Sequence, residues 1–277
     1  MYRLGVVSFL NARPLIAGLD TDRGAALLYD VPARLPAWLD GDRVDAALVP
    51  IIDVLRAGGR YRVLSDACIG CDGETMTVRV FSQVPPDRIQ ALRVDGDSHT
   101  SVALVNVLWR ELYDRVLAIE PFDPRRERMD EAEAVLLIGD KVVDPARGRF
   151  AYEVDLGGAW RQHTGLPFVF AVWAVKAQAA DAARRAALAK LLSEARDRGV
   201  RAAADIAERF GPQLGWPVEL ARRYLTRCLS YRLDARAIAG ADLFAKRCAA
   251  AALVPAGARV EWPAGLAAAT PAEPVGR

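Results

Sequence analysis

The chain has 277 residues, 52% of them hydrophobic and 26% charged, so it can bury the core of one or two domains and is not a disordered chain. Its 37 basic and 35 acidic residues leave a formal net charge of +2, which predicts no bulk attraction to nucleic acid or to a membrane surface. It has no apolar run of roughly 18 residues and no apolar signal-peptide core, so we expect a cytoplasmic protein without membrane spans.

Short apolar runs alternate with amphipathic segments through residue 175, a pattern typical of an α/β sheet. We predict strands at 2–8, 25–31, 45–49, 75–82, 91–95, 133–139 and 167–175. Between them we predict helices at 13–20, 34–41, 51–58, 101–116 and 126–132. The helix at 101–116 has the clearest apolar stripe, which includes Val105, Leu108 and Trp109, and we assign that stripe to the core.

Beyond Lys176 the periodicity is helical only. The predicted helices there are 178–198, 201–210, 217–230 and 234–253. From 254 to 277 Pro, Gly and Ala dominate, so we expect a mobile tail. The apolar segments 75–82 and 167–175 stand where the chain would cross between two lobes. We therefore predict a discontinuous lobe 1 from residues 1–82 and 176–253, a lobe 2 from residues 83–175, and a ligand cleft between them.

Four cysteines occur, and Cys68 and Cys71 form a C-x-x-C pattern. A zinc site would need a second pair of ligands at similar spacing, whereas Cys228 and Cys248 lie far apart on helical patterns. A redox motif would place the second cysteine inside a helix, but here a strand follows. We expect buried, reduced cysteines and no metal site.

Two stretches place polar groups at the ends of strands. Residues 8–15 follow the first strand and bring Ser8, Asn11 and backbone N–H groups to its carboxyl end, where open α/β sheets usually bind ligands. An ordinary N-cap role for Asn11 is the alternative. Residues 97–101 precede the clearest helix, and their three hydroxyl groups favour an anion site at its N-terminus. Plain capping by Ser98 or Thr100 is the alternative there.

Six blocks of sequence, taken in order, resemble the chorismate dehydratase family of the futalosine route to menaquinone. The blocks are residues 8–15, 44–50, 71–73, 97–104, 137–140 and 164–173. They cover roughly the first 175 residues, and the last hundred residues match only in being helical. No block is specific by itself, but the ordered set is.

This resemblance implies a type II periplasmic-binding-protein-like fold, α/β in class, with two α/β lobes and a ligand cleft between them. It implies a lyase that converts the dicarboxylate chorismate to 3-[(1-carboxyvinyl)oxy]benzoate and water, without metal or organic cofactor and without nucleic-acid or membrane partners. Two alternatives stay open at this point. One is the sister enzyme 1,4-dihydroxy-6-naphthoate synthase, and the other is a non-catalytic solute-binding protein.

The resemblance also assigns roles to individual residues. Asn11 and Thr77 are the predicted catalytic contacts, with Thr77 standing where the family usually has Ser. His99 stands where relatives often have Arg, and we expect its side chain to face away from the substrate. The predicted substrate-binding residues are Ser8, Ser98, Thr100, Ser101, Asp140 and Phe168. Turn, cap or core packing roles are the alternatives for Asp140 and Phe168.

Overall fold

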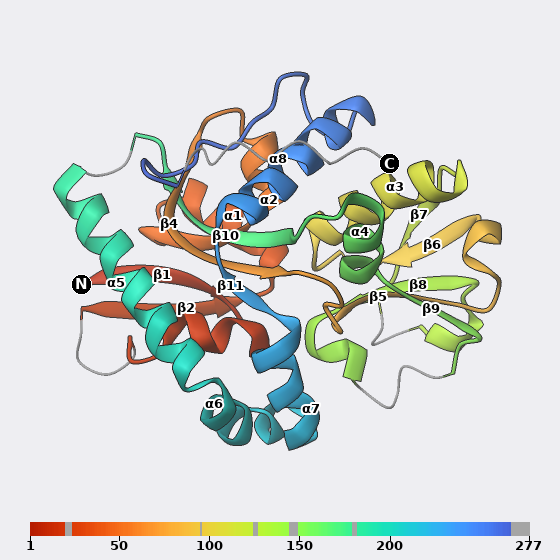
Figure 1. The fold of residues 1–277 in the computed structure, drawn as a ribbon, viewed down its shortest axis with the longest axis horizontal. Coiled ribbons are helices and arrows are strands. Elements are labelled where there is room, and N and C mark those ends of the chain that lie inside the picture. The colour runs from red at the N-terminus through yellow and green to blue at the C-terminus, as the bar shows by residue number, and fades with distance from the viewer. Residues whose placement is uncertain (20–23, 95, 124–126, 144–148, 179–181, 267–277) are drawn as a thin grey trace.

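Two β-sheets lie side by side in the computed structural model, which describes residues 1–19, 24–94, 96–123, 127–143, 149–178 and 182–266 (Figure 1). The larger sheet has six strands in the order β11-β4-β10-β3-β1-β2, and the smaller has five in the order β7-β6-β8-β5-β9. Helices pack around both sheets, so the predicted pair of α/β lobes is confirmed.

The strands of the larger sheet come from both ends of the chain. They are β1 (Tyr2–Val7), β2 (Ala25–Asp30), β3 (Ala46–Pro50), β4 (Tyr61–Cys71), β10 (Phe168–Lys176) and β11 (Ser230–Arg232). Strand β1 is parallel to β2 and β3, whereas β10 is antiparallel to β3 and β4. The strands of the smaller sheet are β5 (Val78–Ser82), β6 (Ala91–Val94), β7 (Ala118–Pro121), β8 (Ala134–Ile138) and β9 (Tyr152–Asp155). There β6 is parallel to β7 and β8, and β5 is antiparallel to β8 and β9.

Most of the predicted helices are present, but α4 was not predicted, and the helix predicted at 126–132 is only a 3-10 turn over Met129–Glu131 in the described residues. The α-helices are α1 (Leu35–Asp40), α2 (Ile51–Arg56), α3 (His99–Tyr113), α4 (Leu156–Thr164), α5 (Ala182–Arg201), α6 (Ala203–Phe210), α7 (Val218–Arg223) and α8 (Ala235–Ala250). The first predicted helix is instead a 3-10 helix over Leu10–Ile16, because Pro14 lacks the N–H that would donate to Leu10 in an α-helix. The segment predicted as one helix at 217–230 divides into α7, a π-helical turn over Tyr224–Cys228 and the start of β11.

Strands β4, β7, β9 and β11 were not predicted, and β4 is the longest of them. Charged and polar side chains interrupt its apolar pattern, and the chief one is Asp66. In the structure Asp66 accepts a hydrogen bond from Arg196 of α5 at 3.0 Å, and Arg196 is itself buried. A charge can be buried when a partner satisfies it, and this partner lies 130 residues away in the sequence, beyond the reach of local pattern.

The crossings between the lobes lie outside the two long apolar strands. Strand β5 belongs wholly to the smaller sheet and β10 wholly to the larger one, so the chain crosses before Val78 and again before Phe168. These points correct the predicted boundaries of 83–175 for the second lobe. Each of these two strands is the first strand of its sheet after a crossing. Both are apolar because a central strand is buried on both faces.

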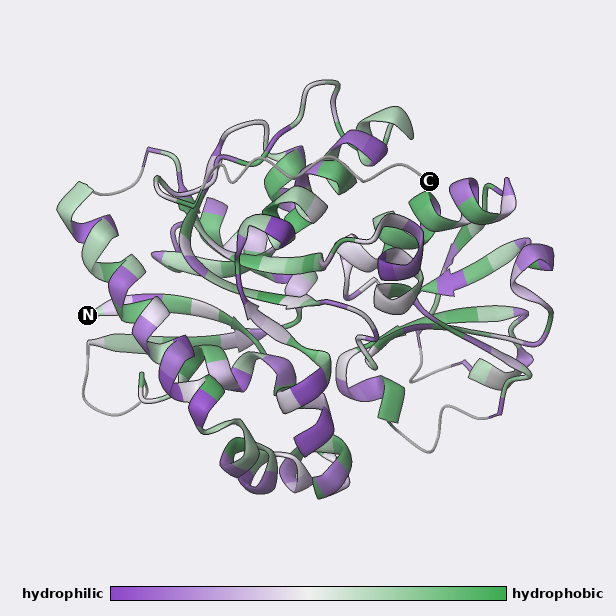
Figure 2. Cartoon of the chain, in the orientation of Figure 1, coloured by the Kyte–Doolittle hydropathy of each residue, from purple (hydrophilic) through white to green (hydrophobic). Residues whose placement is uncertain are grey.

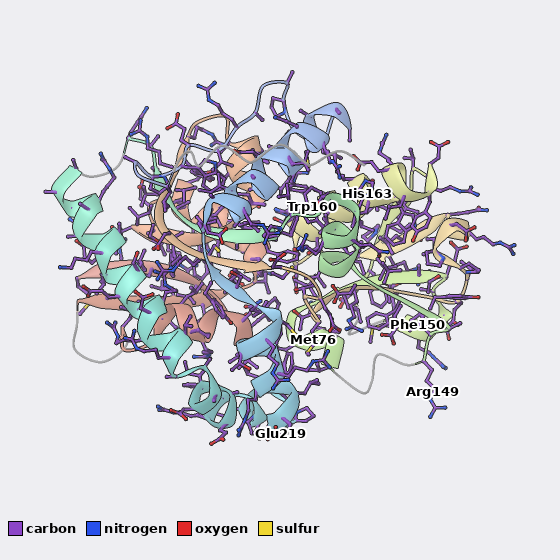
Figure 3. The ribbon with its side chains drawn as sticks, viewed as in Figure 1. Met76, Arg149, Phe150, Trp160, His163 and Glu219 are labelled. Atoms are coloured by element: carbon purple, nitrogen blue, oxygen red, sulfur yellow. The ribbon has the colours of Figure 1, made fainter. Side chains whose placement is uncertain are left out.

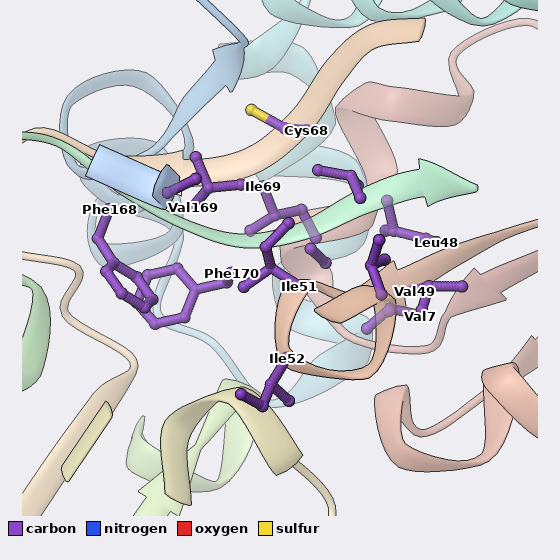
Figure 4. Packing of buried hydrophobic residues seen from close by; sticks show 14 of the residues in the cluster. Val7, Leu48, Val49, Ile51, Ile52, Cys68, Ile69, Phe168, Val169 and Phe170 are labelled. Carbon is purple, nitrogen blue, oxygen red and sulfur yellow. The ribbon is translucent and has the colours of Figure 1, made fainter. Parts of the chain in front are cut away.

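The core lies on both faces of the larger sheet. The strands are its most hydrophobic parts, while the outer helices mix polar and apolar residues (Figure 2). Phe168 and Phe170 of β10 pack with ring centroids 4.7 Å apart, beside Ile52 and Ile69 in the same cluster (Figure 4). Across the described ranges, no helix is long and apolar enough to cross a membrane.

The first part of the predicted tail packs against the body. Val254 and Val260 are buried, and the indole N–H of Trp262 donates to Asp242 of α8 at 3.0 Å. These contacts place residues 254–266 on the protein surface as an ordered segment, which corrects the expectation of mobility there. Residues 267–277 lie outside the described residues.

Candidate functional site

A cavity opens between the two sheets and encloses about 490 Å³ of empty space, part of it open to solvent. Residues of both lobes line it. The polar ones are Asn11, Thr75, Thr77, Ser98, Ser101 and Tyr224, and the aromatic ones besides Tyr224 are Phe9 and Phe170. Among the described lining residues there is no acid, histidine, lysine or arginine. A ligand in this cavity is therefore held by neutral polar groups and apolar walls.

Asn11 faces this cavity from the 3-10 helix that follows β1. The helix is capped by Phe9 without a side-chain hydrogen bond, so Asn11 is not the N-cap that the alternative interpretation required. Its Oδ1 atom is buried and has no hydrogen-bond partner in the described part of the chain. Because buried polar atoms are almost always paired, an unpaired amide oxygen in a cavity indicates a ligand that donates to it.

Thr77 comes from the first crossing segment, whose backbone is held by Asp155. The carboxylate of Asp155 accepts from the N–H groups of Thr75 at 2.9 Å and Met76 at 2.7 Å, and it also caps α4. Met76, with φ of +66°, lies between the lobes (Figure 3). A left-handed conformation is costly for a non-glycine residue, so these bonds fix the turn that aims Thr77. Burial raises the pKa of Asp155.

The hydroxyl of Thr77 meets a tyrosine from the C-terminal third of the chain. Thr77 Oγ1 and Tyr224 Oη are 2.6 Å apart in a buried hydrogen bond. Burial raises the pKa of Tyr224, although hydrogen bonds from Thr77 and Asn11 oppose the rise, so the phenol stays neutral. The tyrosine ring stacks on Trp216 with centroids 4.8 Å apart and an interplanar angle of 11°.

Asp140 joins the lobes just outside the cavity. Its Oδ1 accepts from the indole N–H of Trp216 at 2.9 Å and from the backbone N–H of Leu10 at 3.3 Å. Burial raises its pKa, and these two hydrogen bonds oppose the rise. The preceding Gly139 has φ of +61°, and a Cβ there would lie 2.6 Å from the ring of Phe9. Glycine is therefore required where the backbone lines the cavity.

The N-terminus of α3 divides its hydroxyl groups between two tasks. Ser98 caps the helix by accepting from the Ser101 N–H, and the two serine hydroxyls, 2.8 Å apart, line the cavity. Thr100 instead donates to the carbonyl of Phe170 at 3.1 Å. His99 lies with Nδ1 2.8 Å from Asp53 of α2, and it is not among the lining residues. Capping and cavity lining thus coexist at Ser98.

Half of the predicted site residues meet at this cavity. Asn11, Thr77, Ser98 and Ser101 line it. The other four described residues, Ser8, Thr100, Asp140 and Phe168, are not among its lining residues. Phe168 packs in the aromatic core instead, with Trp160 at 5.3 Å and Phe244 at 5.0 Å between ring centroids.

Sequence reasoning missed Asp155, Trp216 and Tyr224. A signal existed for the first, because Asp is a favoured N-cap residue and Asp155 directly precedes α4, a helix that was not predicted. Trp216 stands between the predicted helices 201–210 and 217–230, where no motif marks it. Tyr224 lies in a segment of helical period with no motif, so nothing local distinguished it from a core tyrosine.

The four cysteines contribute no chemistry at the cavity. All of them are buried and none forms a disulfide. Burial raises the pKa of the Cys68 and Cys71 thiols, and it raises that of Cys248 to about 12. Thiols in this state are inert, so the interpretation of the C-x-x-C pattern as packing is confirmed.

Solved structures define the class of this architecture. The chain is similar to a protein of Archaeoglobus fulgidus with a TM-score of 0.71 and 14% identity, over 91% of this chain and 98% of that one. A Candida albicans protein described as having the generic periplasmic binding protein fold gives 0.64 at 12% identity, over 92% and 91%. The periplasmic aliphatic sulphonate binding protein of Escherichia coli gives 0.61 at 12% identity, over 94% of each chain. This is the periplasmic-binding-protein fold, as predicted, and the cavity lies in its cleft between the lobes.

The sequence comparison narrows the class to a family. The chain belongs to the menaquinone biosynthesis family, which it matches over residues 2–250. It is 29% identical over 244 residues to a protein of Thermus thermophilus named chorismate dehydratase, a match that covers 81% of this chain and 87% of the relative. The predicted family resemblance is thereby confirmed.

Proposed function

We propose that this protein is a chorismate dehydratase, a carbon–oxygen lyase that forms 3-[(1-carboxyvinyl)oxy]benzoate and water from chorismate in menaquinone biosynthesis. The likeness to the Thermus thermophilus dehydratase over most of both chains carries the proposal. A cleft cavity lined by hydroxyl and amide groups and by apolar side chains supports a small, partly apolar ligand. A cytoplasmic location and the absence of any cofactor belong to the same proposal.

The structure of chorismate itself favours the proposed reaction, so the protein has few tasks. The C3 proton of chorismate is acidified by conjugation through C1=C2 to the ring carboxylate, and loss of the C4 hydroxyl then leaves an aromatic ring. The protein holds the two carboxylates, stabilises charge that develops on the ring carboxylate, and keeps water out. Ser98 and Ser101 at the N-terminus of α3 are placed to take one carboxylate, since the positive end of the helix dipole faces the cavity there.

The mechanism needs a base that takes the C3 proton. The described residues lining the cavity include no carboxylate or histidine, and the raised pKa of Tyr224 disfavours a tyrosinate base. Chorismate carries its own enolpyruvyl carboxylate close to the C3 proton. We therefore propose substrate-assisted catalysis, in which Asn11 and Thr77 fix the orientation of the substrate and, with it, the position of that carboxylate.

The test is turnover of chorismate by the purified protein after treatment with a chelator, followed by ultraviolet spectroscopy. We expect the diene spectrum of chorismate to give way to that of an aromatic enol ether, at a rate unchanged by added metal. Saturable binding of chorismate without turnover would instead favour a solute-binding protein. Turnover that requires restored metal would reject the cofactor-free mechanism.

A further inference from the structure

The proposed mechanism leaves one buried hydroxyl in the cavity without a role. Tyr224 is 1% exposed, and its Oη lies 2.6 Å from Thr77 Oγ1. Either oxygen can be the donor in this bond. The two groups together carry two O–H protons and use one of them on each other, so one O–H proton is left for a ligand.

Asn11 presents the complementary group next to it. Asn11 and Tyr224 line the same cavity, and Asn11 is near enough to the phenol to oppose the rise in its pKa. Its Oδ1 remains buried and unpaired in the described part of the structure. The cavity therefore offers one O–H donor and one carbonyl acceptor at neighbouring positions. A carboxylate can only accept hydrogen bonds, whereas an alcohol both donates and accepts, so this pair of groups matches a ligand hydroxyl.

We propose that Tyr224, paired with Thr77, donates a hydrogen bond to the C4 hydroxyl oxygen of chorismate as it leaves, while Asn11 Oδ1 accepts from that hydroxyl. This inference rests on the proposed function. In the reaction the C3–H bond breaks and its electron pair enters the ring, and the C4–O bond breaks with its pair on oxygen. The proton from C3 and the departing hydroxide leave as water, and Tyr224 ends unchanged.

Two positioning residues keep the phenol in place. The ring of Trp216 lies nearly parallel to that of Tyr224, and the Trp216 indole N–H is fixed by Asp140 from the other lobe at 2.9 Å. The phenol is thus clamped between a stacked ring and the Thr77 hydroxyl. A donor held in this way stabilises charge that appears on the leaving oxygen without first reorganising, which acts on kcat more than on KM.

The test compares two tyrosine-to-phenylalanine variants. Tyr224→Phe keeps the stacked ring and removes only the hydroxyl. Tyr231→Phe is the matched control, because Tyr231 is also buried, its hydroxyl has no partner within the described residues, and it does not line the cavity. For Tyr224→Phe we expect kcat to fall about 10²- to 10³-fold. We expect KM to stay within about threefold of the wild-type value. The control should have wild-type kinetics.

The aromatic product gives a second readout, because it has no C4 hydroxyl. Its inhibition constant should be the same for wild type and Tyr224→Phe. A loss of product affinity in step with kcat would mean that Tyr224 only shapes the cavity and would overturn the inference. So would a fall in kcat of less than about tenfold in an enzyme whose wild type turns over chorismate. A wild type without turnover overturns the proposed function and this inference together.

The variant Thr77→Val tests the other member of the Thr77–Tyr224 hydroxyl pair. It keeps the inference testable if Tyr224→Phe proves unstable. It removes the second hydroxyl and nearly preserves the shape of the side chain. If the two hydroxyls act as one donor, the single changes lower kcat by similar factors, and the double variant is no worse than the more severe single one. Multiplication of the two effects would contradict a shared role.

Discussion

At the residue scale, Asn11 is the side chain that most strongly indicates ligand binding at the site. Its amide oxygen is buried in a cavity and has no donor among the described residues, although such atoms are nearly always satisfied. It does not cap its helix, and the charged residues that precede Thr77 are engaged elsewhere. Glu74, for example, pairs with Arg223 at 2.7 Å, and Asp72 pairs with Arg236 at 3.0 Å. Asn11 is therefore free to orient a ligand.

We predict that Asn11→Ala lowers kcat about a hundredfold, because a reacting group that is slightly misplaced loses about this much rate. The fold should be retained, since Asn11 Oδ1 makes no hydrogen bond within the described protein. Steady-state kinetics with chorismate and a thermal unfolding curve measure the two effects.

The comparison set for this variant is the group of acids and the histidine at positions 72–74, 97–99 and 140. Its members are Asp72→Asn, Glu74→Gln, Asp97→Asn, His99→Gln and Asp140→Asn. Each should keep more activity than Asn11→Ala. If one of them abolishes turnover while the folded protein still binds chorismate, that residue is the base and the substrate-assisted mechanism is wrong.

At the element scale, the first crossing segment and α4 are held together by one shared carboxylate. A single carboxylate, Asp155, caps α4 through the Gly158 N–H and holds the N–H groups of Thr75 and Met76 in the crossing turn. The helix and the turn are thereby fixed relative to one another. Thr77 N–H in turn donates to the Thr75 carbonyl at 2.8 Å, which closes the turn that presents the Thr77 hydroxyl. Helix capping and the geometry of the site are thus coupled.

We predict that Asp155→Ala both destabilises the protein and slows catalysis. It removes a helix cap, worth about 1 kcal/mol, and two further hydrogen bonds to a carboxylate, worth about 1.5–3 kcal/mol each before burial of that carboxylate is set against them. The freed Met76 can leave its left-handed conformation, so kcat should fall as well. Denaturant unfolding and turnover of chorismate measure the two losses.

Asp234→Ala is the matched control, because Asp234 caps α8 through the Ala237 N–H and holds no part of the crossing turn. It should cost about 1 kcal/mol and leave kcat unchanged. Equal kinetic effects of the two variants would show that capping alone is being measured.

At the scale of the whole molecule, the two lobes share one hydrophobic cluster and are also joined by hydrogen bonds around the cavity. The Leu10 N–H donates to Asp140 at 3.3 Å, and the Ala33 N–H donates to the Asp97 carbonyl at 3.2 Å. Both bonds run from the larger-sheet lobe to the smaller one. A ligand that touches both lobes favours the arrangement in which these bonds are made, since it can shift an equilibrium only through such differential contacts.

We predict that the aromatic product slows hydrogen exchange at the Leu10 and Ala33 amides. With ligand at 100 times Kd the closed arrangement gains about 2.7 kcal/mol, or about a hundredfold in protection. Exchange measured with and without product by NMR tests this. The Gln83 amide, which donates to the Glu133 carbonyl within the smaller lobe, is the internal reference and should change little. Equal slowing at all three amides would indicate general stabilisation instead of lobe closure.

Local sequence pattern was enough to predict the class of fold, the order of most elements and the polar strand ends that supply Asn11, Ser98 and Ser101 to the cavity. These features are local: an apolar period predicts a strand or helix, and a hydroxyl cluster before a helix predicts an N-terminus. Asn11, Ser98 and Ser101 stand next to such boundaries, so their place at the cleft followed from the position of each element.

The remaining features of the fold and the site depend on pairings between segments that are distant in the sequence, so local pattern could not predict them. The burial of β4 requires Arg196 to satisfy Asp66, and the hydrogen bond of Thr77 requires Tyr224, 147 residues further along the chain. Thr100 and Phe168 are residue types that suit a binding site. In the folded chain, however, Thr100 donates to a backbone carbonyl and Phe168 packs in an aromatic core. Local pattern fixes which face of an element is apolar, but only the folded chain fixes which partner completes each polar group.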